Sequence, residues 1–86
     1  MAKLWNAESG ECARTFSGHG ASVRSAVFSP HSTQVLTASR DRTAKLWNAE
    51  SGECTRTFSG HGDSVFSAVF SPDSTQVLTA YEQKSN

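Results

Sequence analysis

Residues 18–48 read GHGASVRSAVFSPHSTQVLTASRDRTAKLWN, and residues 60–80 repeat the first part of this stretch as GHGDSVFSAVFSPDSTQVLTA. The match extends further, since residues 2–38 align with residues 44–80 at an offset of 42 without a gap. Of these 37 aligned positions 33 are identical, and those that differ are Ala13/Thr55, Ala21/Asp63, Arg24/Phe66 and His31/Asp73. Self-similarity at a fixed period is the signature of a repeat architecture.

Each repeat predicts four short β-strands and no helix. Residues 22–29 and 33–38 are rich in β-branched and aromatic residues, and a Pro-His-Ser turn separates them. Residues 44–48 follow an Arg-Asp-Arg turn, and residues 53–58 follow a turn that ends in Gly52. Four strands in 42 residues match the dimensions of one blade of a β-propeller.

Composition argues against several classes of protein. Lys plus Arg and Asp plus Glu each number eight, so no net charge draws the chain to nucleic acid or to an anionic membrane. No apolar run approaches the ~20 residues that cross a bilayer, and the N-terminal residues do not resemble a secretory signal. Cys12 and Cys54 occupy equivalent places in the repeat, so they predict no disulfide framework and favour a reducing, cytoplasmic location.

Several motifs in the same order and spacing resemble the WD-repeat β-propeller family. They are the Gly-His pairs at 18–19 and 60–61, the Val-Phe-Ser-Pro stretches, the Ser-Arg-Asp turn and Leu-Trp-Asn, and they cover about residues 2–80. Two motifs depart from the family pattern. Trp-Asp is Trp-Asn here, and the Pro-Asp-Gly hairpin is Pro-His-Ser or Pro-Asp-Ser, which should weaken the turn slightly. The resemblance implies an all-β fold and a role in binding proteins, without a cofactor.

In the family, each blade holds a hydrogen-bond network of His, Ser or Thr, Asp and Trp. The residues that the resemblance assigns to this network in the two repeats are His19, Thr37 or Ser39, Asp41 and Trp47, and His61, Thr79 and Trp5. Gln83 stands where the second repeat would need its aspartate. A His beside Ser and Asp would also fit a hydrolase, but no oxyanion-hole loop accompanies it, so we expect a structural network and not an enzyme.

Two further groups of residues are candidates for sites. The spacing Cys12-x6-His19, repeated at Cys54 and His61, is wider than usual zinc ligand pairs, so no metal site is predicted. Two of the positions that differ between repeats, Ala21/Asp63 and Arg24/Phe66, lie near the entry to strand A, where the resemblance implies that the partner-binding face begins. With two nearby arginines they form the candidate contact surface: Arg24, Phe66, Asp63, Arg40 and Arg42. Drift of exposed residues explains the same differences.

The resemblance also sets the phase of the repeat. A blade of the family runs from an inner strand A through B and C to an outer strand D, so this chain reads C–D, then A–B–C–D, then A–B. The expected boundaries are residues 1–21 for strands C–D, 22–63 for the complete blade, 64–80 for strands A–B, and 81–86 for a tail outside the repeat. A single chain would leave two apolar faces and several strand edges in water.

Copies of the chain can complete one another, because strands A–B of one copy can pair with strands C–D of the next. The 86 residues make two periods of 42 with two left over, so the join has neither a gap nor a long overhang. We therefore expect a β-propeller fragment of two four-stranded antiparallel blades that homo-oligomerisation completes to a closed ring. Seven blades, the number most common in the family that the chain resembles, need a turn of about 51° per blade. A homotetramer of eight blades turns about 45° per blade and a homotrimer of six about 60°. The homotetramer is preferred because its angle is nearer to that of seven blades.

Two interpretations of function stay open. The first is a self-assembling propeller, evolved or engineered, that serves as a protein-interaction scaffold. The second is a non-functional, truncated remnant of a larger bacterial WD-repeat signalling protein, which the irregular tail favours. Under either interpretation, the balanced charge predicts that the chain binds no nucleic acid and no membrane.

Overall fold

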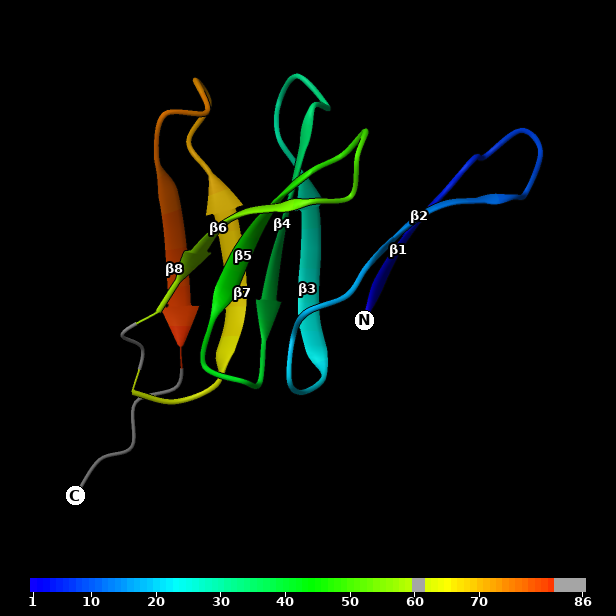
Figure 1. Cartoon of the computed structure of the whole chain (residues 1–86). Coiled ribbons are helices and arrows are strands. Elements are labelled where there is room, and N and C mark those ends of the chain that lie inside the picture. Colours follow the sequence, from blue (N-terminus) through cyan, green and yellow to red (C-terminus); the bar gives the residue numbers. More distant parts are fainter. Residues whose placement is uncertain (60–61, 82–86) are drawn as a thin grey trace.

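The computed structural model describes residues 1–59 and 62–81 of the chain, and its regular elements there are all β-strands (Figure 1). The strands are β1 (Ala2–Trp5), β2 (Cys12–Phe16), β3 (Val23–Phe28), β4 (Gln34–Ser39), β5 (Ala44–Asn48), β6 (Cys54–Phe58), β7 (Val65–Phe70) and β8 (Val77–Tyr81). The described residues contain no helix that is long and apolar enough to cross a membrane.

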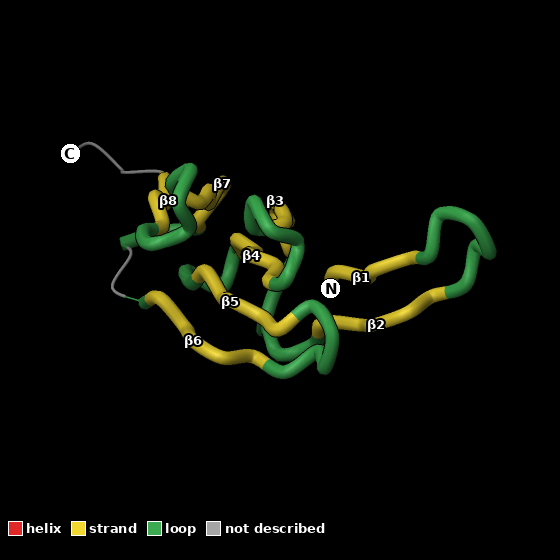
Figure 2. The backbone as a smooth tube through the Cα atoms, turned by 90° about the horizontal axis from the view of Figure 1, so that it is seen from above, coloured by secondary structure: helices red, strands yellow, loops and turns green. Residues whose placement is uncertain are grey.

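The strands form three antiparallel sheets. Strands β3, β4, β5 and β6 pair in that order as a central four-stranded sheet, while β1–β2 and β7–β8 are two-stranded hairpins. The hairpins lie on opposite sides of the central sheet (Figures 1 and 2). The predicted all-β fold is thereby confirmed, whereas its completion by other copies of the chain stays a prediction.

Strand ends follow the sequence analysis to within two residues, and the β3–β4 turn shows why they shift. The N–H of Ser29 donates to the carbonyl of Gln34 at 2.9 Å, which ends the ladder and closes the turn. Ser32 within this turn has φ 61°, and Ser74 in the β7–β8 turn has φ 64°. Both serines replace the glycine of the family's hairpin, in a left-handed conformation that glycine adopts with less strain.

The core lies on both faces of the central sheet because side chains alternate along a strand. On one face, Leu36 and Ala38 of β4 pack with Ala44 of β5 against Val65 and Ala68 of β7. These apolar contacts join the central sheet to the C-terminal hairpin.

The opposite face carries a second cluster. Val35 of β4 and Trp47 of β5 pack there against Phe16, the last residue of β2, and against Ala49. The rings of Phe16 and Trp47 lie 5.5 Å apart between centroids, in a tilted arrangement. This cluster anchors the N-terminal hairpin.

Candidate functional site

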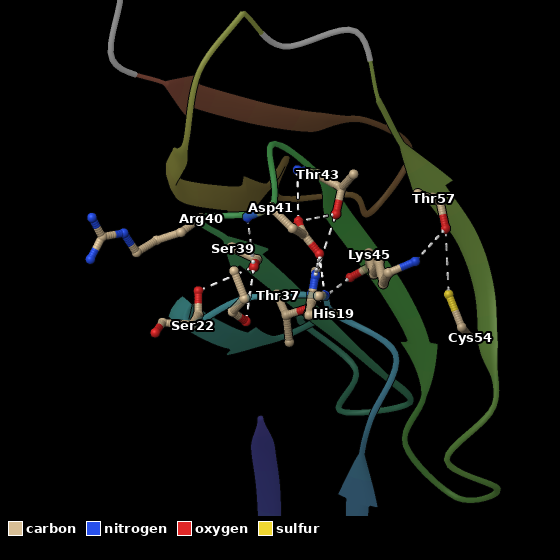
Figure 3. Close-up of polar contacts among 12 residues, drawn as sticks. His19, Ser22, Thr37, Ser39, Arg40, Asp41, Thr43, Lys45, Cys54 and Thr57 are labelled. Carbon is tan, nitrogen blue, oxygen red and sulfur yellow. Dashed lines mark hydrogen bonds and ion pairs between the residues drawn. The ribbon is translucent and has the colours of Figure 1, made fainter.

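A chain of hydrogen bonds crosses the face of the central sheet that carries Trp47. His19 lies in the loop before β3, and its Nδ1 is 2.9 Å from Oδ2 of Asp41, in the β4–β5 turn (Figure 3). Nε2 of the same ring lies 2.6 Å from Oγ1 of Thr37 on β4. The indole Nε1 of Trp47 on β5 donates to that Oγ1 at 2.9 Å. Two strands, the turn between them and a loop are thus tied together by four side chains.

The proton positions follow from the donors and acceptors. An ionised Asp41 accepts only, so Nδ1 of His19 donates to it. A neutral imidazole then has Nε2 free to accept from the hydroxyl of Thr37, whose oxygen accepts from the indole of Trp47. The His19 side chain is 2% exposed and Thr37 is fully buried. This burial favours a structural role, since both side chains are closed off from solvent.

Asp41 links the β4–β5 turn to the loop before β3. Its carboxylate accepts from the N–H of Gly20 at 2.9 Å, the N–H of Thr43 at 3.0 Å and the hydroxyl of Thr43 at 2.5 Å. Burial opposes ionisation of this carboxyl, but the hydrogen bonds from Thr43, His19 and Gly20 outweigh it and hold the pKa of Asp41 well below its ordinary value. The carboxylate therefore stays charged at neutral pH.

Ser39 takes a different place from Thr37. Its hydroxyl lies 3.1 Å from the carbonyl of Ser22 and accepts from the backbone N–H of Asp41 at 3.1 Å (Figure 3). Of the two hydroxyls that the resemblance allowed, the structure thus places Thr37 against His19 and Ser39 against the backbone. Thr43 was not considered from sequence, although the pattern Asp-x-Thr is typical of a turn closed by side-chain hydrogen bonds.

The described members of the second set, Trp5 and Thr79, are not brought together within one chain. Trp5 lies on β1 and Thr79 on β8, in hairpins on opposite sides of the central sheet (Figure 2). His61 and Gln83 lie outside the described residues. Their association remains a prediction about a pair of chains.

The candidate contact surface gathers at one end of the sheets. Arg24 and Phe66 follow the first residues of β3 and β7, and the turn holding Arg40 and Arg42 meets that end because the N–H of Arg40 donates to the carbonyl of Ser22 at 2.9 Å. These four residues are exposed, and Asp63 is partly buried. The Arg40 side chain points away from the His19 network (Figure 3). Its use as a binding surface remains a prediction.

The thiols and acidic side chains form no metal-binding group in the described part of the chain. No cluster of three or more His, Cys, Asp or Glu side chains occurs among those residues. Cys12 and Cys54 are free, exposed thiols.

Comparison with known families identifies the repeat. A family model described as "WD domain, G-beta repeat" matches residues 10–48 and again residues 52–85. The two matches cover most of the chain and follow its 42-residue period. A search among curated proteins found none that matches the sequence.

Proposed function

Because the chain belongs to the WD-repeat family, we propose that the 86-residue polypeptide assembles with copies of itself into a closed β-propeller that serves as a scaffold for binding other proteins. The assembly is argued from exposed surfaces of this chain. The scaffold role rests on the analogy with the family.

The observation that carries the proposal is the unequal burial of identical residues. Trp47 is 2% exposed, whereas Trp5, its equivalent in the other repeat, is 56% exposed. Leu36 is fully buried, whereas its equivalent Leu78 is 70% exposed. The surrounding repeat sequences are nearly the same, so the difference comes from what packs on them. Among the described residues, each exposed side chain lacks the neighbour that its equivalent in the other repeat possesses.

A second copy of the chain can supply the missing neighbour of Trp5. Trp47 packs on Phe16 and Val35 and donates to Thr37. A shift of one 42-residue period turns this set into Phe58, Val77 and Thr79, which lie on β6 and β8. Trp5 of one copy would therefore occupy a site that the C-terminal half of the next copy provides.

The backbone edges are complementary in the same register. β4 pairs with β5 through Ala38↔Ala44, Leu36↔Leu46 and Gln34↔Asn48. Among described residues β8 pairs only with β7 and β1 only with β2, so each of these two strands has one free edge in a single chain. The equivalent pairs between copies are Ala80↔Ala2, Leu78↔Leu4 and Gln76↔Asn6. Such pairing would remove two strand edges that otherwise invite uncontrolled association.

The apolar faces are complementary as well. Leu36 packs against the cluster that contains Val65 and Ala68. One period earlier in the sequence, the equivalents of these two residues on β3 are Val23, which is partly buried, and Ala26, which is exposed. Leu78 of one copy would cover β3 of the next. Each copy thus contacts the next through one of its surfaces and the previous copy through another. Such a head-to-tail contact forms a closed ring when the rotation between neighbouring copies divides a full turn evenly.

Native mass spectrometry across a dilution series tests the proposal. We expect one discrete species with an integral number of 9.2 kDa chains that dissociates on dilution. A Leu78→Lys variant should be monomeric at the same concentration, while Lys45→Met, which alters an exposed polar contact on the complete sheet, should assemble normally. Well-folded monomers, or polydisperse aggregates, from the unaltered chain would instead favour a remnant of a larger repeat protein.

A further inference from the structure

The N-terminal hairpin contacts the central sheet through an arginine at its outer strand. Arg14 lies on β2, and its Nε donates to the carbonyl oxygen of Glu50 in the β5–β6 turn. The guanidinium also donates from Nη1 to the carbonyl of Ala13 at 2.7 Å, which fixes its direction. The contact is close, because a Cβ added at Gly52 would lie 3.5 Å from Cδ of Arg14. The turn of one blade thus rests on the arginine of the blade before it.

The β1–β2 turn has the same internal structure as the β5–β6 turn. Asn48 accepts from the N–H groups of Glu50 and Ser51 at 2.9 Å, and Asn6 accepts from those of Glu8 and Ser9 at the same distance. The glycines that end the two turns, at positions 10 and 52, both have φ 80°. The backbone carbonyl of Glu8 therefore has the same position in its turn as the backbone carbonyl of Glu50 has in the β5–β6 turn.

The two turns differ in what covers them. No described residue beyond its chain neighbours lies within 4 Å of a Cβ added at Gly10, whereas Arg14 lies against Gly52. The equivalent of Arg14 one period later is Arg56, an exposed residue of β6. β6 and the β1–β2 turn lie at opposite ends of the molecule in the view from above, so Arg56 does not reach Glu8 within its own chain (Figure 2).

We propose that Arg56 of one copy binds the backbone carbonyl of Glu8 of the next copy, at the outer rim of the seam between them. This inference rests on the proposed self-assembly and adds a contact outside the shared blade. It repeats between chains the contact that Arg14 and Glu50 make within one chain. A charged donor makes a stronger bond to a carbonyl than a neutral one does, and the planar guanidinium makes the contact sensitive to register.

Cross-linking between two different chains tests this contact. Both chains carry Cys12→Ser and Cys54→Ser, and one adds Arg56→Cys while the other adds Glu8→Cys. After mixing and treatment with a short bis-maleimide, we expect a covalent two-chain product joined at positions 56 and 8, and none from either chain alone. A single chain with Arg14→Cys and Glu50→Cys is the positive control, which should form the link internally.

The outcomes separate this contact from assembly itself. If native mass spectrometry shows a ring but the mixed chains do not cross-link through positions 56 and 8, the Arg56 contact is wrong and the proposed assembly stands. If the mixed chains are monomeric by native mass spectrometry, the proposed function fails together with this inference.

A substitution that retains the side-chain stem measures what the contact contributes. Arg56→Met should accelerate subunit exchange about threefold to tenfold, as expected for one exposed charged hydrogen bond at each seam. Arg14→Met should change the exchange rate by less than about twofold, because that contact lies within a chain. Equal acceleration by both variants would mean a general loss of stability and would contradict a specific role for Arg56.

Discussion

At the scale of single residues, the His19 network depends on a charge that is held in place. Asp41 ionises in spite of its burial because three backbone or hydroxyl donors surround it in addition to the imidazole. A charged acceptor fixes the tautomer of His19, and that tautomer orients the hydroxyl of Thr37. The network is therefore expected to order the β4–β5 turn as well as the core.

Acid should weaken the fold through Asp41. Its folded pKa lies below the ordinary value of 3.8, so its contribution to stability is complete above that pH and is lost as pH falls below it. We expect the urea midpoint to fall between about pH 5 and pH 2. Asp41→Asn should lower stability at pH 7 and make this fall shallower. An equally steep fall in the variant would show that other carboxyls dominate.

Asp73 also contributes to the loss of stability in acid, and its contribution must be distinguished from that of Asp41. Hydrogen bonds from Thr75 and Ser71 lower the pKa of this exposed carboxyl to about 2. Its contribution has the same sign, so it too is lost below the ordinary value of 3.8. Asp73→Asn is the matched control, because it alters a surface turn and leaves the His19 network intact.

The two tryptophans should respond differently to the same substitution. Trp47→Ala removes a buried ring and should lower the free energy of unfolding of the chain by about 3–5 kcal/mol. Trp5→Ala should lower it by less than about 1 kcal/mol in the dissociated chain, since most surface substitutions have small effects. The same change should raise the dissociation constant of the assembly by more than about 100-fold, since about 3 kcal/mol of ring burial is lost there. Analytical ultracentrifugation and urea unfolding of both variants would measure the difference, and equal effects would contradict the shared blade.

The structure brings the residues assigned from the sequence together where one repeat contains the whole motif. His19, Asp41 and Trp47 stand at the positions of the family's network, and the structure joins them through Thr37. The choice between Thr37 and Ser39 was open because residues two apart on a strand point to the same face. The contact between Arg14 and Glu50 had no signal, since a backbone carbonyl accepts from any donor.

At the scale of elements, the hairpin turns carry local strain. Ser74 adopts φ 64°, and its hydroxyl is buried without a hydrogen-bond partner among the described residues. Both features have a cost, since a left-handed backbone is unfavourable for residues with a Cβ and a buried hydroxyl loses its water.

Ser74→Gly should therefore stabilise the C-terminal hairpin by about 1 kcal/mol, because it removes both costs at the expense of some chain entropy. Ser74→Ala is the control, since it removes the hydroxyl but keeps the strained backbone. Thermal unfolding followed by circular dichroism would measure both variants. A glycine variant no more stable than the alanine variant would show that strain at this φ is negligible.

Strand positions were predictable because the repeat has clear alternation and turn residues, and the ends shifted only where a turn such as that at Ser29 closes the ladder. Whether β1 and β8 pair along one edge or along both could not be predicted from their own sequences. They match β5 and β4 closely, yet each has one free edge in a single chain. Whether a strand pairs along both edges therefore depends on which strands lie next to it, and not on its own sequence alone.

Hydrogen exchange should reveal that difference. In the proposed assembly, backbone amides of β1 and β8 that face the seam are protected at high protein concentration and exchange at least about tenfold faster after dilution, because dissociation exposes their edges. Amides of β4 and β5, paired within the chain, should change much less. Mass spectrometry of peptides from these strands makes the comparison. Equal protection of β1 at both concentrations would argue against its pairing with β8 of another copy.

At the scale of the whole molecule, a chain with two repeats restricts the rings that it can form. In the proposed assembly each copy would contribute two blades, so closed rings of identical copies would contain an even number of blades. Rings of four, six and eight lie within the usual range of propellers. Among these, eight blades at about 45° and six at about 60° lie nearest to the seven-bladed geometry at about 51°. The smaller change of angle favours four chains over three.

A tandem chain distinguishes these two ring sizes. Joining two copies head to tail gives four repeats per polypeptide, and two such polypeptides reproduce an eight-bladed ring at the mass of the original tetramer, about 37 kDa. A six-bladed ring cannot be built from units of four, so a protein that normally forms trimers of about 28 kDa would yield other masses. Native mass spectrometry of the tandem chain beside the unaltered protein reads the result directly. We expect two tandem chains with the mass of four single chains, and a trimer from the unaltered protein would overturn the preference for eight blades.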